Sequence, residues 1–120
     1  MAGVETTLPL IYSAGVCTGR LSLERFVQVW TEGPARALGL YPRKGVIAIG
    51  SDADLVLFDP SAKWVLKAQD LHMNSDCLPF EGREVSGKPV VTVLRGRLLV
   101  QDGKLQSPEP FGELVPRHFA

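Results

Sequence analysis

The chain has 120 residues, of which 45% are hydrophobic and 22% charged, and its 13 basic residues balance its 13 acidic ones. This length and composition predict one globular domain of ordinary size. A balanced charge argues against a nucleic-acid-binding surface, and no apolar run approaches the roughly 20 residues that a membrane-spanning helix needs, so we expect neither partner.

The first forty residues have the periodicity of helices. Over residues 5–16, an apolar stripe with helical spacing is formed by Leu8, Ile11, Tyr12 and Val16. Pro9 suits the first turn of this helix, where its missing N–H costs no hydrogen bond.

A second helix is predicted to begin after Ser22, which is a suitable N-cap, and to end before Gly33 and Pro34. Its apolar face has spacing i, i+3, i+4 and i+7 and consists of Leu23, Phe26, Val27 and Trp30. A short third helix is expected to open at Pro34 and to close near Gly39.

After Pro42, glycines separate short runs rich in β-branched residues. Six such runs predict strands: residues 45–50, 53–59, 63–67, 83–87, 89–96 and 97–103. Asp102-Gly103 is the predicted two-residue turn of a hairpin. The pattern predicts an α+β protein with a helical segment over residues 1–42 and a β-sandwich-like sheet region over residues 43–105. Residues 106–120 are expected to form an extended tail that docks on a surface or a partner.

Asp52 and Asp54, two residues apart in "GSDAD", raise the question of a metal site. Hard cations need around six oxygen ligands, and this loop offers two carboxylates. The alternative is a turn in which the aspartates accept backbone N–H groups and Gly50 supplies an unusual backbone conformation. We interpret the stretch as such a turn, which leads into a strand.

The other candidate ligands lie in a polar loop and in the tail. His72 lies in the loop "DLHMNSDCLPFEG", whose remaining potential ligands are Asp70, Asn74, Asp76, Cys77 and Glu81. The second histidine, His118, lies in the proline-rich tail. A mononuclear site built from His72, Cys77 and an acid is conceivable, but a catalytic zinc needs three protein ligands at suitable spacing. We therefore favour a structural loop.

The two cysteines and the N-terminus indicate the cellular compartment of the protein. Cys17 and Cys77 match no disulfide framework, and "MAGVETTLPL" lacks the basic region of a signal peptide. Both features predict a cytoplasmic protein with reduced thiols. The chain also has no GxSxG nucleophile motif and no glycine-rich phosphate loop, so its residues form no recognisable catalytic constellation.

Four stretches nevertheless resemble a known family. "KGVIAIGSDADLVLFDP" (44–60) and "VVTVLRGRLLVQDGKL" (90–105) resemble the C-terminal signature of the amidohydrolase superfamily. Residues 3–45 and "LHMNSDCLPFEGREVSGKPV" (71–90) resemble the C-terminal part of dihydropyrimidinases and D-hydantoinases, so the resemblance covers essentially the whole chain. Glu32 stands where the family commonly has Asn, and Cys77 where Tyr is usual.

The resemblance implies a fold. In this family a (β/α)8 barrel carries the active site, and a small β-sandwich is built from both ends of the chain. Residues 3 to about 42 would be the last helices of the barrel, and residues 43 to about 105 the C-terminal share of the sandwich. Asp52 and Asp54 would then lie in a turn before a sandwich strand, away from the metals.

The resemblance also implies a chemistry. The family opens cyclic amide rings with water activated by two divalent metal ions, typically zinc, which a carboxylated lysine bridges. It places every metal ligand and the substrate-binding Asn before Gly3, so we expect no catalytic, substrate-binding or metal-ligating residue and no cofactor in this chain.

Two hypotheses follow from the resemblance. The first is a C-terminal fragment of a hydantoinase-type hydrolase that is inactive alone, so whether the chain is itself an enzyme stays open. The second is a non-catalytic oligomerisation or interaction module. The expected partners are a second copy of the chain or the N-terminal barrel portion.

Overall fold

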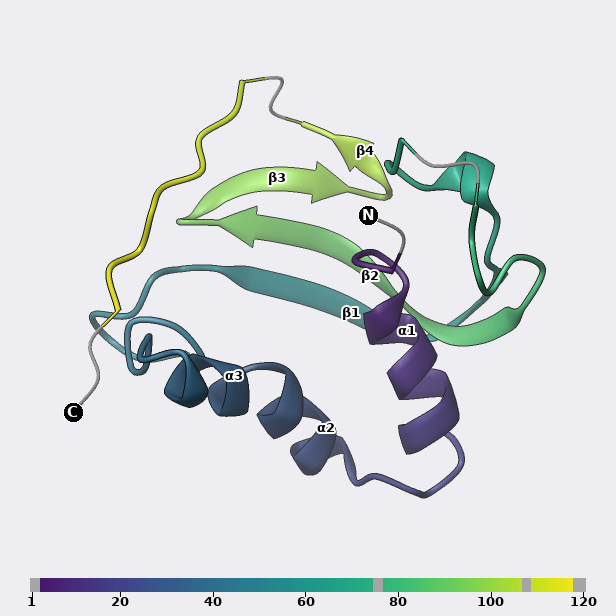
Figure 1. The fold of residues 1–120 in the computed structure, drawn as a ribbon, viewed down its shortest axis with the longest axis horizontal. Coiled ribbons are helices and arrows are strands. Elements are labelled where there is room, and N and C mark those ends of the chain that lie inside the picture. The colour runs from purple at the N-terminus through teal and green to yellow at the C-terminus, as the bar shows by residue number, and fades with distance from the viewer. Residues whose placement is uncertain (1–2, 75–76, 107–108, 118–120) are drawn as a thin grey trace. The chain divides into compact units, whose positions relative to one another are not determined.

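The computed structural model describes residues 3–74, 77–106 and 109–117. The helices come first (Figure 1): α1 (Thr7–Ile11), the π-helical turn η1 (Tyr12–Val16), α2 (Leu23–Trp30) and α3 (Glu32–Ala37). The strands follow: β1 (Leu55–Val65), β2 (Glu84–Leu94), β3 (Arg97–Gln101) and β4 (Lys104–Leu105), with the 3-10 turn η2 (Ala68–Asp70) between β1 and β2. Helices followed by a sheet confirm the α+β class.

The chain divides into two compact units. Unit 1 comprises Met1–Phe26 and Asp59–Lys88, and unit 2 comprises Val27–Phe58 and Pro89–Ala120. Each unit therefore contains residues from both the helical and the strand-rich part of the chain. Within the described residues, no helix is both long and apolar enough to cross a membrane.

The first helix changes its hydrogen-bonding pattern part of the way along. Pro9 lies in the first turn of α1 and is buried, as the sequence predicts. From Tyr12 the chain continues as a π-helical turn, in which the Cys17 N–H donates to the carbonyl of Tyr12. The buried Tyr12 ring packs edge-on against Phe26, with 5.6 Å between the ring centres. This contact fixes the start of α2 against η1 within unit 1.

Helix α2 begins where its cap predicts. The Arg25 N–H donates to Ser22 Oγ at 3.2 Å, which confirms Ser22 as the N-cap. On the predicted apolar face only Phe26 is buried, whereas Leu23, Val27 and Trp30 are exposed. Helix α2 is therefore amphipathic, but other residues cover its apolar face only in part.

Helix α3 begins earlier than predicted. It starts at Glu32, two residues before Pro34, so the expectation that Pro34 opens the helix was wrong. Pro34 is instead the third residue of the first turn, where an N–H has no partner within the helix, so proline costs no hydrogen bond there.

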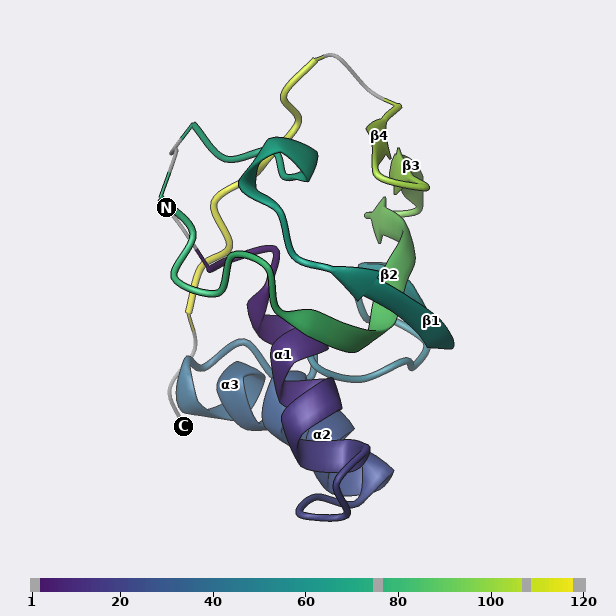
Figure 2. The same cartoon turned by 90° about the vertical axis from the view of Figure 1, so that its right-hand side faces the viewer.

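The strands form one four-stranded sheet in the order β1-β2-β3-β4, and in Figures 1 and 2 β3 lies between β2 and β4. β2 and β3 are antiparallel, as are β3 and β4, where Gln101 is opposite Lys104. Asp102 and Gly103 between them have φ values of 50° and 73°, which confirms the predicted two-residue turn.

The strand boundaries differ from the six predicted runs. Residues 45–50 form bends, irregular backbone and a turn rather than a strand. The runs at 53–59 and 63–67 join into the single strand β1 across Pro60, and those at 83–87 and 89–96 join into β2. β1 lies at the edge of the sheet, where a proline can occupy a strand because an edge strand leaves one row of N–H groups without ladder partners.

Unit 1 has a small hydrophobic core. Its buried residues are Leu66, Leu78 and Val85, and the partly buried residues packed against them are Leu10, Trp64, Ala68, Leu71 and Met73. Leu10 comes from α1, so the core joins the first helix to the segment between β1 and β2. The Trp64 indole N–H donates to the carbonyl of Gly87 at 3.0 Å, which adds a polar bond beside this core.

Candidate functional site

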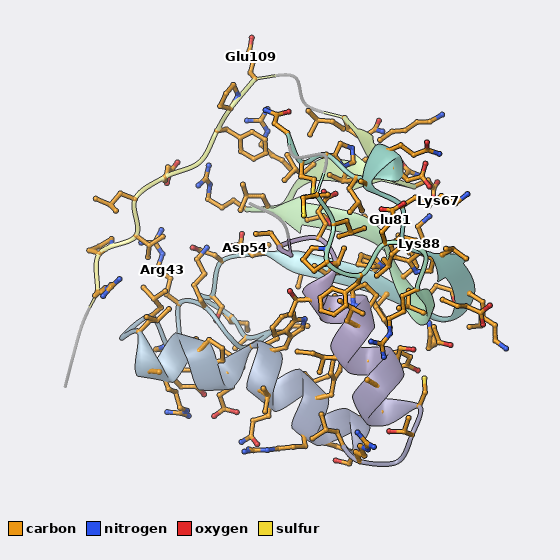
Figure 3. All side chains as sticks on the ribbon, turned by 45° about the vertical axis from the view of Figure 1, so that its right-hand side comes forward. Arg43, Asp54, Lys67, Glu81, Lys88 and Glu109 are labelled. Carbon is orange, nitrogen blue, oxygen red and sulfur yellow. The ribbon has the colours of Figure 1, made fainter. Side chains whose placement is uncertain are left out.

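A cluster of charged groups in unit 2 surrounds Lys44. Its ammonium lies 2.7 Å from Asp52 Oδ2 and also contacts Asp54 Oδ2. Arg43 Nε donates to Asp52 Oδ2 at 3.0 Å, and the Arg95 backbone N–H donates to Asp54 Oδ1 at 2.8 Å. Figure 3 labels Arg43 and Asp54 in this part of the chain. Both ends of the "KGVIAIGSDAD" stretch are thus joined through Lys44.

These contacts shift the pKa values of Asp52 and Lys44. The hydrogen bond from Lys44, supported by that from Arg43, holds the pKa of Asp52 below its ordinary value. Partial burial acts to lower the pKa of Lys44, but the hydrogen bonds to Asp52 and Asp54 outweigh it, so the pKa is raised. The chemistry of the cluster is that of an internal ion-pair network, with both carboxylates already bound by cations of the same chain.

Acid should weaken this network, and Asp52 sets the direction of the effect. Because its pKa is lower in the folded than in the unfolded chain, its contribution to stability is complete above the unfolded value. That contribution is lost as the pH falls below about 4. We expect the Asp52→Asn chain to lose less stability than the wild type between pH 5 and pH 2 in urea unfolding. Equal losses in the two chains would contradict this assignment.

The candidate ligands of the polar loop have other partners in unit 1. The His72 backbone N–H donates to Glu5 Oε2 at 2.7 Å, and its Nδ1 lies 2.7 Å from Glu5 Oε1. Glu81 Oε2 accepts the Ala68 N–H at 2.8 Å, while Cys77 is exposed. Figure 3 labels Glu81 and also Lys67, which belongs to the same unit.

The remaining candidates do not add to this group. Asp70 and Asn74 are exposed, and Asp76 and His118 lie outside the described residues. The structure therefore pairs His72 with Glu5 and gives Glu81 a backbone partner, rather than placing the two together with Cys77 around one point.

A pair of divalent metals does not fit the donor groups described here. Across residues 3–74, 77–106 and 109–117, no three His, Cys, Asp or Glu side chains are close enough to hold a metal ion. Asp52 and Asp54 already bind Lys44. That no metal-ligating residue lies anywhere in the chain stays a prediction.

Two partners in these networks were not singled out from the sequence. Glu5 precedes its partner His72 by 67 positions, so no local pattern could indicate the contact. Arg95 has a local signal: "RG" at 95–96 separates two apolar runs, as in a hairpin turn. Arg95 and Gly96 indeed have positive φ values of 48° and 77° between β2 and β3.

Comparison with known proteins gives hydantoinases as relatives. The chain is 40% identical over 114 residues to a D-hydantoinase of Geobacillus stearothermophilus, covering 95% of this chain and 24% of the relative. It is 41% identical over 115 residues to an L-hydantoinase of Paenarthrobacter aurescens, covering 96% of this chain and 25% of that relative. The chain thus spans about a quarter of the length of the curated relatives it matches.

Solved structures show the same similarity. The D-hydantoinase (dihydropyrimidinase) from Thermus sp. superposes with a TM-score of 0.91 at 41% identity, over 96% of this chain and 25% of that one. The dihydropyrimidinase from Brevibacillus agri superposes with a TM-score of 0.80 at 38% identity, over 82% of this chain and 22% of that one. The sequence model of the amidohydrolase family matches residues 2–99, and this chain belongs to that family.

Proposed function

We propose that this chain acts as the C-terminal region of a metal-dependent hydrolase that opens cyclic amide rings such as hydantoins and dihydropyrimidines. The supporting observation is the match of 95% or more of the chain to D- and L-hydantoinases at about equal identity. Because both stereochemical classes match equally, we propose that residues outside this chain set the preference for one stereoisomer. The two divalent metals would supply an activated water, and the described residues of this chain contain no group of three or more His, Cys, Asp or Glu side chains that could hold such an ion.

The proposal assigns a structural part to each segment. Residues 1–42 would be the last helices of a barrel, residues 43–105 a share of a β-sandwich, and residues 106–120 an extended tail. The chain's own residues would not contact the reacting atoms. Their work would be to close the barrel and to order the sandwich through the Lys44 network and the core around Leu66.

The proposal predicts that the chain alone does not open either ring. With all metal ligands expected outside these 120 residues, hydantoin and dihydrouracil should be hydrolysed at the background rate even with added Zn²⁺ or Mn²⁺. Ring opening is followed by the loss of ultraviolet absorbance. Turnover above background by the purified chain would contradict the expected absence of catalytic residues.

A complementation experiment tests the assignment itself. The Geobacillus stearothermophilus D-hydantoinase would be shortened by the 114 residues that match this chain and co-expressed with the chain. We expect ring opening in the combined sample and in neither part alone. The relative's own matching segment is the positive control. Activity restored by that segment but not by this chain would count against the proposed role.

A second candidate function, an interaction module, is favoured by the exposed apolar side chains. Leu23, Val27 and Trp30 of α2 are exposed, and Ile47 and Ile49 are almost fully so. Fully burying an exposed side chain of this size is worth roughly 1.5–3 kcal/mol, and proportionately less for one that is already half covered. Large exposed apolar patches are also rare on soluble monomers. We therefore propose that the chain, when alone, associates with a second copy.

Self-association has a direct test in sedimentation equilibrium at micromolar concentration. We expect a dimer or larger species, and a dissociation constant at least about tenfold weaker for Val27→Glu because roughly 1.4 kcal/mol of apolar contact corresponds to that factor. Gln28→Glu adds the same charge at a polar position of α2 and is the matched control. A wild-type chain that remains monomeric would refute the proposal.

A further inference from the structure

Phe111 and Glu113, in the segment 109–117, contact Arg95 in the turn between β2 and β3, and Phe111 also contacts Arg97 at the start of β3. Residues 109–117 contain neither helix nor strand, and Glu109 marks the start of this segment in Figure 3. The Arg97 guanidinium lies 4.2 Å from the centre of the Phe111 ring, and that of Arg95 lies 5.7 Å from it. Both arginines are within the range at which a cation is attracted to an aromatic face.

Arg95 adds two polar contacts to the same segment. Its guanidinium donates a hydrogen bond to the carbonyl of Phe111, and Nη2 lies 3.4 Å from Glu113 Oε1. Three-quarters of the Arg95 side chain is covered, with 24% exposed. Removal of the tail would take away the carbonyl acceptor of this partly covered cation and the ring beside it.

The backbone of Arg95 faces a different part of unit 2. Its N–H donates to Asp54 Oδ1 at 2.8 Å, and the next N–H, of Gly96, donates to the carbonyl of Ala53 at 2.9 Å. Asp54 in turn contacts Lys44. Arg95 has a positive φ of 48° as the first residue of the two-residue turn between β2 and β3.

From this double attachment we propose that residues 109–117 are a strap that docks reversibly on Arg95 and Arg97 and thereby orders the loop that contains Asp52 and Asp54. The side chain of Arg95 binds the strap. The backbone N–H groups of Arg95 and Gly96 bind Asp54 and Ala53, so an ordered Arg95 also orders these two residues. Because the strap is held by an aromatic ring, a carbonyl and a carboxylate rather than by strand pairing, it can leave without breaking the sheet.

Amide hydrogen exchange of the full chain tests this coupling, since exchange rates report local opening at individual N–H groups. We expect Phe111→Ala to speed the exchange of the Arg95 and Gly96 amides by about tenfold or more, in line with the loss of a cation–π pair and a weakened hydrogen bond to a charged group. Leu114→Ala is the matched control, because Leu114 lies in the same segment and is 97% exposed. Leu114→Ala should leave the exchange rates of the Arg95 and Gly96 amides unchanged.

The amide of Leu10, which donates to the carbonyl of Thr6 and belongs to unit 1, separates local from global effects. It should exchange at the wild-type rate in all variants. If Phe111→Ala does not fold, Arg97→Gln carries the test, since it removes the nearer cation and keeps the Arg95 contacts. The proposal is overturned if the Arg95 and Gly96 amides of the folded variant exchange at the wild-type rate. It is also overturned if Leu114→Ala speeds their exchange to the same extent.

Discussion

Replacing Gly45 by alanine is expected to destabilise the chain by about 2–5 kcal/mol, as the sum of two costs. Gly45 has a φ of +85°, and a side chain in the left-handed region costs roughly 1–2 kcal/mol. The new Cβ would also lie 2.6 Å from Ala35 Cβ and 3.0 Å from the carbonyl oxygen of Thr31. Overpacking of this kind costs about 1–3 kcal/mol more, because the contacted atoms belong to the backbone and the buried face of α3.

Gly50→Ala is the matched control for this prediction. Gly50 belongs to the same loop and has a φ of +93°, but nothing lies within 4 Å of the position of a new Cβ. Its substitution should therefore show the conformational cost alone, about 1–2 kcal/mol. Urea unfolding of both variants measures the difference. Similar losses for the two variants would mean that the close approach of Gly45 to α3 does not contribute.

Truncating Leu66 to alanine is expected to cost about 2–5 kcal/mol, the range for a buried leucine whose cavity closes only in part. Leu66 is fully buried, and with Leu78 and Val85 it forms the centre of the unit 1 core. So few residues form this centre that a missing isopropyl group removes a large share of its contacts. Leu10 of α1 packs against the same cluster, so α1 should loosen as well.

Two tryptophans allow this prediction to be resolved by unit. Trp64 belongs to unit 1 and Trp30 to unit 2, so a Trp30→Phe background leaves a fluorescence signal from unit 1 alone. Leu57→Ala, at a residue that is 52% exposed, is the control and should cost far less. A Leu66→Ala chain with the urea midpoint of this control would show that the core around Leu66 is not what holds unit 1 together.

The sandwich architecture and the domain boundary near residue 42 stay predictions of the family resemblance. The described residues show one sheet in the order β1-β2-β3-β4. The two compact units each combine residues from before and after Pro42. The helices therefore precede the strands along the sequence, but the boundary between the two compact units does not coincide with the boundary between helices and strands.

Features that depend on a few neighbouring residues were determined by the sequence itself. Ser22 caps α2, Pro9 lies in a first turn, and Asp102-Gly103 forms the hairpin turn, because each of these choices is decided by the local backbone and its hydrogen bonds. The family is readable in the same way, since four contiguous stretches carry the resemblance, and the family model matches residues 2–99.

Only the tertiary structure decided what the apolar run at 45–50 becomes. Its β-branched composition favours a strand, but the positive φ of Gly45 and Gly50 and the close approach of Gly45 to α3 turn the chain instead. The same holds for the partners of the charged residues. Lys44 reaches across ten positions to Asp54, and Glu5 across 67 to His72. Such pairs depend on where the fold brings distant backbone segments together, and composition and periodicity carry no information about that.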